Sequence, residues 1–104
     1  MPREQFQTLS EPMYYILLSL IEECCGVDIM KRVLDISSGR ITVGPGTLYT
    51  LLSRFEETGA IKETKILGRK RWYIITNDGK ELLKDEYERL KIMLKDGNAT
   101  MGRL

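Results

Sequence analysis

The side chains with the clearest chemical purpose in this sequence lie within residues 44–61, and they suit recognition rather than catalysis. Thr47, Thr50 and Arg54 are spaced three and four residues apart, so on an α-helix they share one face. Hydroxyl and guanidinium donors on one helical face can bond to the edges of DNA bases and to the phosphates beside them. The alternative is a packing helix that turns a few hydroxyl groups to water, and the residues that follow favour recognition.

The helix that would carry these side chains is marked at both ends. Gly44 can act as its N-cap, and Pro45 suits the first helical position because its missing N–H would have no intrahelical partner. Gly59 favours the left-handed conformation that ends many helices. The apolar residues in between follow the i, i+3, i+4, i+7 spacing of one buried face. They are Leu48, Leu51, Leu52 and Phe55.

A group of basic residues follows this helix. Segments 61–66 and 71–76 are rich in β-branched and aromatic residues, and the glycine-containing turn 67–70 between them predicts a two-stranded hairpin. Tyr73 and Ile75 share one face of the second strand and are assigned to the core side. A hairpin with a basic tip, placed directly after a recognition helix, is typical of a winged helix-turn-helix, and a solvated basic loop is the alternative. The basic residues are Arg69, Lys70 and Arg71.

The distribution of charge favours contact with a polyanion in this part of the chain. The net charge is only +1, but residues 31–75 hold nine Lys or Arg against four Asp or Glu, a local charge of +5. Residues 1–30 carry −4, and residues 76–104 are neutral. The predicted DNA contacts are Thr47, Thr50 and Arg54 to base edges, Thr42, Tyr49 and Ser53 to phosphates, and Arg69, Lys70 and Arg71 to the backbone or minor groove.

Residues suited to catalysis or to metal binding are scarce. The sequence has no histidine, the commonest general base and metal ligand. Cys24 and Cys25 are adjacent and lack the further ligands of a zinc site. We expect a reduced, partly buried pair, with a redox switch through an intermolecular disulfide as the alternative. The sequence therefore predicts no enzyme, metal or cofactor.

The composition, 42% apolar and 30% charged, is that of a globular protein in water. The longest apolar run, near residues 14–21, is too short to span a bilayer, so no membrane partner is expected. The N-terminus has no basic-then-apolar signal segment, which predicts a cytoplasmic protein.

The remaining patterns predict three more helices. The first begins at an N-cap, Ser10, and runs to about Cys24, with Ile21 on its apolar face. The second covers about 27–36 and turns Val27, Met30, Val33 and Leu34 inward. The expected class is mainly α with a small β-hairpin (α+β), a winged helix-turn-helix plus a C-terminal dimerisation helix. The expected organisation is an N-terminal arm over 1–9, the winged helix-turn-helix over 10–76, the dimerisation helix over 77–97, capped by Thr76 and ended by Gly97, and a flexible tail over 98–104.

The first and last helices carry apolar residues that so short a chain cannot easily cover. The first is apolar on nearly all sides, and the last has an a/d seam among dense charge, which suits a partner helix. We expect a homodimer, with a single deep core as the alternative. The predicted interface residues are Tyr14, Leu18, Leu83, Tyr87, Leu90 and Leu94. A small-molecule site between the subunits is predicted at Tyr14, Tyr15, Leu18, Tyr87 and Met93, with a plain dimer core as the alternative.

Over about residues 9–97 this chain resembles the PadR-type transcriptional regulators. The resemblance rests on EPMYYIL at 11–17, GPGTLY at 44–49, ETGAI at 57–61 and RWYIIT at 71–76, followed by Gly79. The short form with one C-terminal helix is similar to the smaller subfamily.

The resemblance implies a homodimeric winged-helix repressor whose last helix packs against the partner's first and last helices. It also implies a pseudo-palindromic operator and, in some members, relief of repression by a small ligand. Two positions depart from the family pattern. Val27 stands where an aromatic residue is common, and the last helix lacks the tryptophans that stack flat drugs in some small members, since Trp72 lies in the hairpin. The alternative function is a winged-helix module for protein–protein contact.

Overall fold

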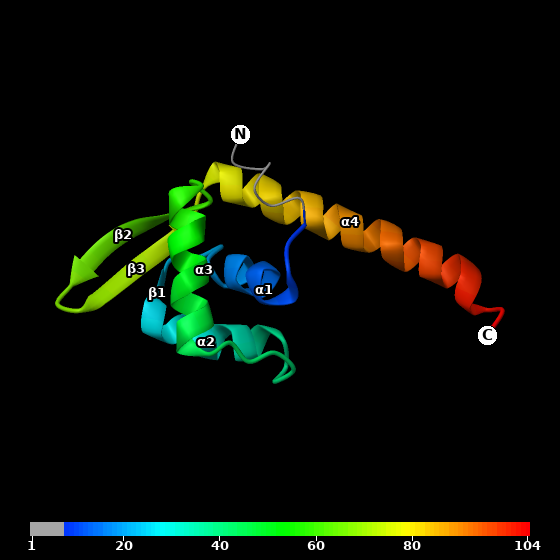
Figure 1. The fold of residues 1–104 in the computed structure, drawn as a ribbon, viewed down its shortest axis with the longest axis horizontal. Helices are drawn as coiled ribbons and strands as arrows, with labels where there is room; N and C mark the ends of the chain where they lie inside the picture. Colours follow the sequence, from blue (N-terminus) through cyan, green and yellow to red (C-terminus); the bar gives the residue numbers. More distant parts are fainter. Residues whose placement is uncertain (1–7) are drawn as a thin grey trace.

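The computed structural model describes residues 8–104, which form four helices and one three-stranded antiparallel sheet (Figure 1). This arrangement confirms the predicted α+β class. The strand order is β1-β3-β2, so β3 is central. Residues 1–7, most of the predicted arm, lie outside the described part of the chain. The elements are α1 (Glu11–Ser19), β1 (Cys24–Cys25), α2 (Gly26–Ile36), α3 (Pro45–Glu57), β2 (Ile61–Leu67), β3 (Lys70–Ile75) and α4 (Asn77–Met101).

The predicted helix starts are confirmed by their caps. Ser10 is the N-cap of α1, and its hydroxyl accepts a hydrogen bond from the Met13 N–H at 3.4 Å. Gly44 is the N-cap of α3. Thr76 caps α4, and its hydroxyl accepts from the Gly79 N–H at 3.1 Å. These three capping residues define where α1, α3 and α4 begin.

The first helix is shorter than predicted. α1 ends at Ser19, and its terminal carbonyl is held by the Arg32 guanidinium of α2, which donates to it at 2.9 Å. Ile21, assigned to the buried face of a longer helix, is 51% exposed. Cys24 and Cys25 form β1 beside β3. A strand of two residues has no periodicity by which a sequence could reveal it.

The inward face predicted for the second helix is right in part. Val33 is fully buried and Met30 packs against the core, as predicted, but Val27 and Leu34 are 51% and 37% exposed. Ile29, which was not predicted to face inward, is fully buried. Gly26 begins α2 and is itself buried. Atoms of α3 and β3 lie 3.5 to 3.7 Å from the place where a Cβ would stand at Gly26, so the start of α2 packs closely beneath them.

The core lies between α1, α2, α3, the start of α4 and the sheet. Tyr73 and Ile75 are each 4% exposed, which confirms their assignment to the core side of the hairpin. Leu9, assigned to the arm, is 7% exposed and belongs to the core, so the predicted arm boundary is wrong at its end. The largest fully buried apolar side chains are Ile16, Leu17, Leu20, Ile29, Val33, Leu48, Leu52 and Phe55.

The last helix is longer than predicted and projects from the body. α4 has 25 residues and continues through Gly97, which was expected to end it, so the predicted tail is helical as far as Met101. One glycine inside a helix costs only about 1 kcal/mol, which neighbouring turns can outweigh. The buried residues of α4 end at Glu86, and the remainder extends away from the other elements (Figure 1).

The start of α4 is held against the beginning of β2 by backbone contacts. The Thr76 N–H donates to the Ala60 carbonyl at 2.9 Å, and the Thr76 hydroxyl donates to the Gly59 carbonyl. A Cβ at Gly79 would lie 2.1 Å from the Ala60 carbonyl oxygen and 2.6 Å from Cγ1 of Ile75. Glycine is therefore required at position 79 by this close approach of two backbones.

We predict that Gly79→Ala lowers the free energy of unfolding by about 3 kcal/mol, because the two backbones must separate to admit a methyl group. Gly46→Ala in α3 is the matched control, since no atom lies within 4 Å of a Cβ at Gly46, and it should gain up to about 1 kcal/mol. Urea unfolding followed by circular dichroism measures both. A Gly79→Ala variant as stable as the wild type would contradict the argument.

Candidate nucleic-acid interface

The exposed face of α3 presents the polar side chains that the sequence predicted there. Thr47, Thr50 and Arg54 are all exposed, and Ser53 lies beside them. The opposite side of the helix is buried in the core, so α3 is held firmly while its polar face remains open. The structure thus brings the three predicted base-contacting residues onto one surface, and their contact with DNA stays a prediction.

Tyr49, a predicted phosphate contact, also packs against the protein. Its ring is 45% exposed, and its Cε1 lies 3.5 Å from the place of a Cβ at Gly26. The Arg71 carbonyl oxygen lies 3.7 Å from the same point. The outer face of α3 and the base of the hairpin are therefore neighbours. This relation joins positions 26, 49 and 71, which are far apart in the chain, so no local pattern in the sequence reveals it.

Thr42 lies apart from the α3 face. It is exposed in the connection that precedes α3 and lines a hollow of about 270 Å³ beside α2. A phosphate contact by Thr42 would therefore come from the α2 side of the motif, where the helix before the recognition helix crosses the DNA backbone. The other residues of this hollow are Met30, Lys31, Leu34 and Val43.

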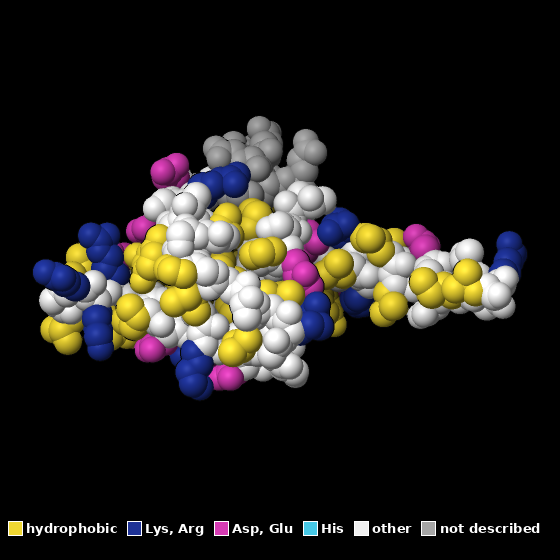
Figure 2. All heavy atoms as spheres, turned by 60° about the horizontal axis from the view of Figure 1, so that its bottom comes forward, with side chains coloured by type: hydrophobic (Ala, Val, Ile, Leu, Met, Phe, Trp, Pro, Cys, Tyr) yellow, Lys and Arg dark blue, Asp and Glu magenta, His cyan; other side chains and the backbone are white. Residues whose placement is uncertain are grey.

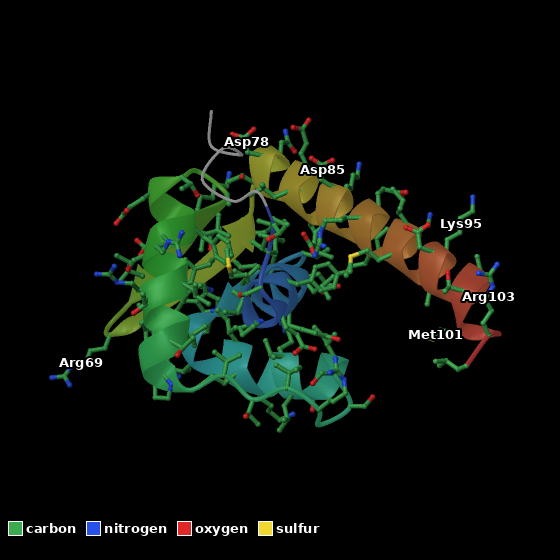
Figure 3. All side chains as sticks on the ribbon, turned by 45° about the vertical axis from the view of Figure 1, so that its right-hand side comes forward. Arg69, Asp78, Asp85, Lys95, Met101 and Arg103 are labelled. Atoms are coloured by element: carbon green, nitrogen blue, oxygen red, sulfur yellow. The ribbon has the colours of Figure 1, made fainter. Side chains whose placement is uncertain are left out.

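Of the three basic residues predicted to contact DNA from the hairpin, two lie at its tip and face outward. β3 begins at Lys70, and the two-residue turn is Gly68–Arg69, with Gly68 at φ +63°. Figure 3 shows Arg69 at the far end of the hairpin, pointing away from the body. Arg71 is different, because its Nη1 lies 3.4 Å from Oε2 of Glu63 on the neighbouring strand. Arg71 is partly committed to the hairpin itself, which leaves Arg69 and Lys70 as the stronger candidates.

The basic surface also includes Lys62 and Lys65, which were not predicted as DNA contacts. The register pairs Lys62 with Ile74 and Lys65 with Trp72, and directly paired residues share a face. This face is opposite to that of the buried Tyr73. The Lys65 ammonium lies 4.4 Å from the centre of the Trp72 ring. A β-bulge just before Lys65 shifts the alternation of the strand, so a strict period of two would have assigned Lys65 to the core side.

A second candidate site is a hollow of about 280 Å³ between α1 and α4. Tyr14 and Tyr15 line it as predicted, with ring centres 5.7 Å apart in an edge-to-face arrangement. Leu18 lines a different hollow at the other end of α1, and Tyr87 and Met93 stand on α4 with 53% and 54% of their surface exposed. A single chain therefore assembles only part of the predicted pocket. The hollow is lined by Leu9, Glu11, Tyr14, Tyr15, Glu86, Arg89 and Leu90.

Both carboxylates at this hollow are compensated by arginines. Glu86 is only 5% exposed, and its carboxylate accepts from the Arg89 guanidinium and, at 3.0 Å, from the Leu9 N–H. The hydrogen bonds from Arg89 hold the pKa of Glu86 below its usual value. Glu11 accepts from Arg40 at 2.8 Å. The burial of Glu86 could not be predicted from the sequence, because a carboxylate on a densely charged helix normally faces water.

The two cysteines are buried free thiols in β1. Burial raises the pKa of the Cys24 thiol, which disfavours the reactive thiolate. Successive side chains of a strand point to opposite faces, so the two thiols diverge. Among residues 8–104, no group of three or more His, Cys, Asp or Glu side chains could hold a metal ion. None of the helices described is both long and apolar enough to cross a membrane.

An exposed polar helix, α3, positioned beside a basic antiparallel hairpin is the arrangement of a winged-helix fold. The chain belongs to the PadR-like family of transcriptional regulators, which it matches over residues 16–85. The matched residues run from the middle of α1 to the last part of α4 that packs on the body. No curated protein matches the chain.

Several solved structures share this fold. A transcriptional regulator from Clostridium thermocellum is 23% identical, with a TM-score of 0.72 over 86% of this chain and 91% of that one. A PadR family regulator from Clostridium difficile R20291 is 23% identical, with a TM-score of 0.68 over 86% and 97%. A PadR family regulator from Eggerthella lenta DSM 2243 is 25% identical, with a TM-score of 0.68 over 86% and 80%.

We predict that Glu86→Gln lowers the free energy of unfolding at pH 7 by about 1–2 kcal/mol, because a neutral amide is a weaker acceptor for Arg89. Since the pKa of Glu86 is lowered in the folded state, the carboxylate stabilises the fold fully above its unfolded pKa of about 4.3. That contribution is lost as the pH falls through the folded pKa.

Denaturant titrations at pH 7, 5 and 3 test this expectation. The difference between wild type and Glu86→Gln should shrink toward the lowest pH. Glu88→Gln is the matched control, because Glu88 is exposed on the same helix and pairs with Lys91 only at the surface, so its effect should stay below about 0.5 kcal/mol. A Glu86→Gln effect that does not change with pH would contradict the proposed role of the charge.

Proposed function

We propose that this chain represses transcription as a homodimer bound to a pseudo-palindromic operator in double-stranded DNA, and that a small molecule relieves the repression. The observation that carries the proposal is the polar face of α3 directly beside a basic hairpin. Hydroxyl and guanidinium groups of α3 suit base edges in a major groove, and the hairpin tip suits phosphates or the adjacent minor groove. A module for protein contact would need no basic tip in this position.

The proposed dimer forms through α4. Beyond Glu86 no residue of α4 is buried, yet the helix keeps an apolar seam of heptad spacing. A projecting helix end without tertiary contacts is only marginally stable in water. The α4 helix of a second copy would cover the seam, and two-fold symmetry would set the two α3 helices roughly 10 bp or a multiple apart on DNA. Leu83, the first residue of the predicted seam, is 9% exposed and packs in the core of its own chain. The exposed apolar residues at heptad spacing are Tyr87, Leu90, Leu94 and, one heptad further on, Met101.

The proposed effector site is the hollow between α1 and α4. Tyr14 and Tyr15 offer aromatic surface there, and Arg89 and Arg40 neutralise the two carboxylates of its lining. Such a site suits a small, largely apolar ligand with an aromatic part. A ligand that favours a different angle between α1 and α4 would shift the dimer away from the spacing that DNA requires.

Fluorescence anisotropy with the DNA upstream of this protein's own gene, against a scrambled duplex, tests the function. Tight binding of one dimer to the upstream DNA, with a steep dependence on salt, is the expected result. Equal, weak binding to both duplexes at every salt concentration would contradict a self-regulating, sequence-specific repressor. Addition of small aromatic compounds to the complex then tests whether any ligand releases the DNA.

We predict different effects for a base contact and a phosphate contact. Arg54→Ala should lower affinity for the operator by about 1–3 kcal/mol, mainly through one base position. Lys70→Ala should weaken binding to every duplex and reduce the salt slope by about 1. Lys95→Ala on α4 is the control, because Lys95 lies on the projecting part of α4, away from α3 (Figure 3). An equal loss on all sequences for Arg54→Ala would refute its role as a base contact.

We predict that Leu94→Asp converts the dimer to monomers, because it places a carboxylate in the proposed seam, where it would be buried against the partner. Leu94 is 65% exposed in the single chain, so the circular dichroism of the body should not change. Ile92→Asp is the matched control, since Ile92 is 60% exposed on the same helix but lies off the seam. Sedimentation equilibrium measures the assembly, and an intact Leu94→Asp dimer would contradict this interface.

A further inference from the structure

The tip of the hairpin carries an exposed leucine among cations. Leu67, the last residue of β2, is 67% exposed and is paired directly with Lys70. The turn residue Arg69 follows it. Figure 2 shows this end of the molecule, at left, where hydrophobic side chains lie among Lys and Arg side chains. An apolar side chain in this position adds little to the core, and what distinguishes it is the cations that surround it.

The strand register places Leu67 on the basic side of the hairpin. Because of the β-bulge, it shares a face with the lysines paired to Trp72 and Ile74, whereas Ile66 shares the other face with Arg71. Of residues 61–75, all of which are described, the one acidic side chain is Glu63, and it also lies on that other face. The outer hairpin face therefore combines cations with an apolar tip. It consists of Lys62, Lys65, Leu67, Lys70, Trp72 and Ile74.

The tip stands well clear of the body. The outermost strand pair with a buried member is Glu63 with Tyr73, and Leu67 lies four residues further along β2. At about 3.3 Å per residue this is a reach of roughly 13 Å. The minor groove of B-DNA is about 6 Å wide and 7.5 Å deep, so a narrow hairpin tip can enter it.

We infer that Leu67 is an apolar wedge that the hairpin presses into the minor groove beside each half-site. Lys65, Arg69 and Lys70 would hold the phosphates on either side, and Leu67 would contact the sugars and partly unstack one base step. The charges around the leucine select duplex DNA as its occupant, since an apolar protein surface would leave these cations without partners. This inference rests on the proposed function.

The wedge adds a source of sequence preference outside the bases that α3 can touch. Unstacking is easiest at flexible pyrimidine–purine steps such as TA and CA. Operators should therefore favour such a step in the minor groove flanking each half-site, although no hydrogen bond from the protein reads it. The DNA should also bend toward the major groove at these two positions.

The test uses the full chain and 40-bp duplexes selected by the wild-type protein from a random library. Leu67→Ala should weaken binding to the selected duplex by about tenfold, the effect of withdrawing one buried leucine side chain. The salt slope should not change, because no charge is removed. Ile66→Ala is the matched control, since Ile66 is the adjacent residue, is 55% exposed and lies on the opposite face, and its effect should stay below about twofold. Leu67→Met should restore most of the affinity.

A second readout separates a wedge from a general surface contact. 2-Aminopurine, which brightens when it is unstacked, is placed in turn at each step that flanks the half-sites. Wild type should brighten one flanking step per half-site, and Leu67→Ala should not. Equal losses for Leu67→Ala and Ile66→Ala, or no brightening at any step with wild type, would overturn the wedge while sequence-specific binding stands. Failure of the wild type to enrich any sequence would overturn the proposed function and this inference together.

Discussion

The contact between Gly79 and the Ala60 carbonyl fixes how the functional elements stand to one another. α3 ends, β2 begins, β3 ends and α4 begins within this one corner, and the Thr76 hydrogen bonds to Gly59 and Ala60 tie it together. Backbone meets backbone there with no side chain between, so little movement is possible. The recognition helix, the hairpin and the start of the projecting helix therefore form one rigid unit. Any change in the angles between these three elements must move the residues of this corner.

The parts of the fold that could be predicted are those with local signals. Caps at Ser10, Gly44 and Thr76 depend on a few neighbouring residues, and so does the helical spacing of the α3 face. The end of α1 could not be predicted, because Arg32 of another helix holds its last carbonyl. The start of α2 packs beneath rings from α3 and β3, a contact between segments far apart in the sequence. Gly97 is a local signal for the end of a helix, but α4 continues through it.

The same distinction between local and non-local signals applies to the candidate interface. The donors of α3 were predictable because one helix carries them all. The outer hairpin face was not, because a single bulge exchanges the two sides of a strand, and with it the roles of Lys65 and Ile66. The buried carboxylate of Glu86 was also hidden, since one of its hydrogen bonds comes from Leu9, 77 positions away. Both features become visible only when non-local pairing is known.

The long, unsupported part of α4 works mechanically as a lever. From Glu86, its last buried residue, to Met101 the helix spans about 23 Å at 1.5 Å per residue, so a bend of roughly 10° beyond Glu86 displaces its far end by about 4 Å. In the opposite direction, a large displacement between the α4 ends of two copies would rotate the body of each copy by only a small angle. A regulator built this way can adjust the alignment of its DNA-facing surfaces by fractions of a base-pair rise while its subunit contacts shift by several ångströms.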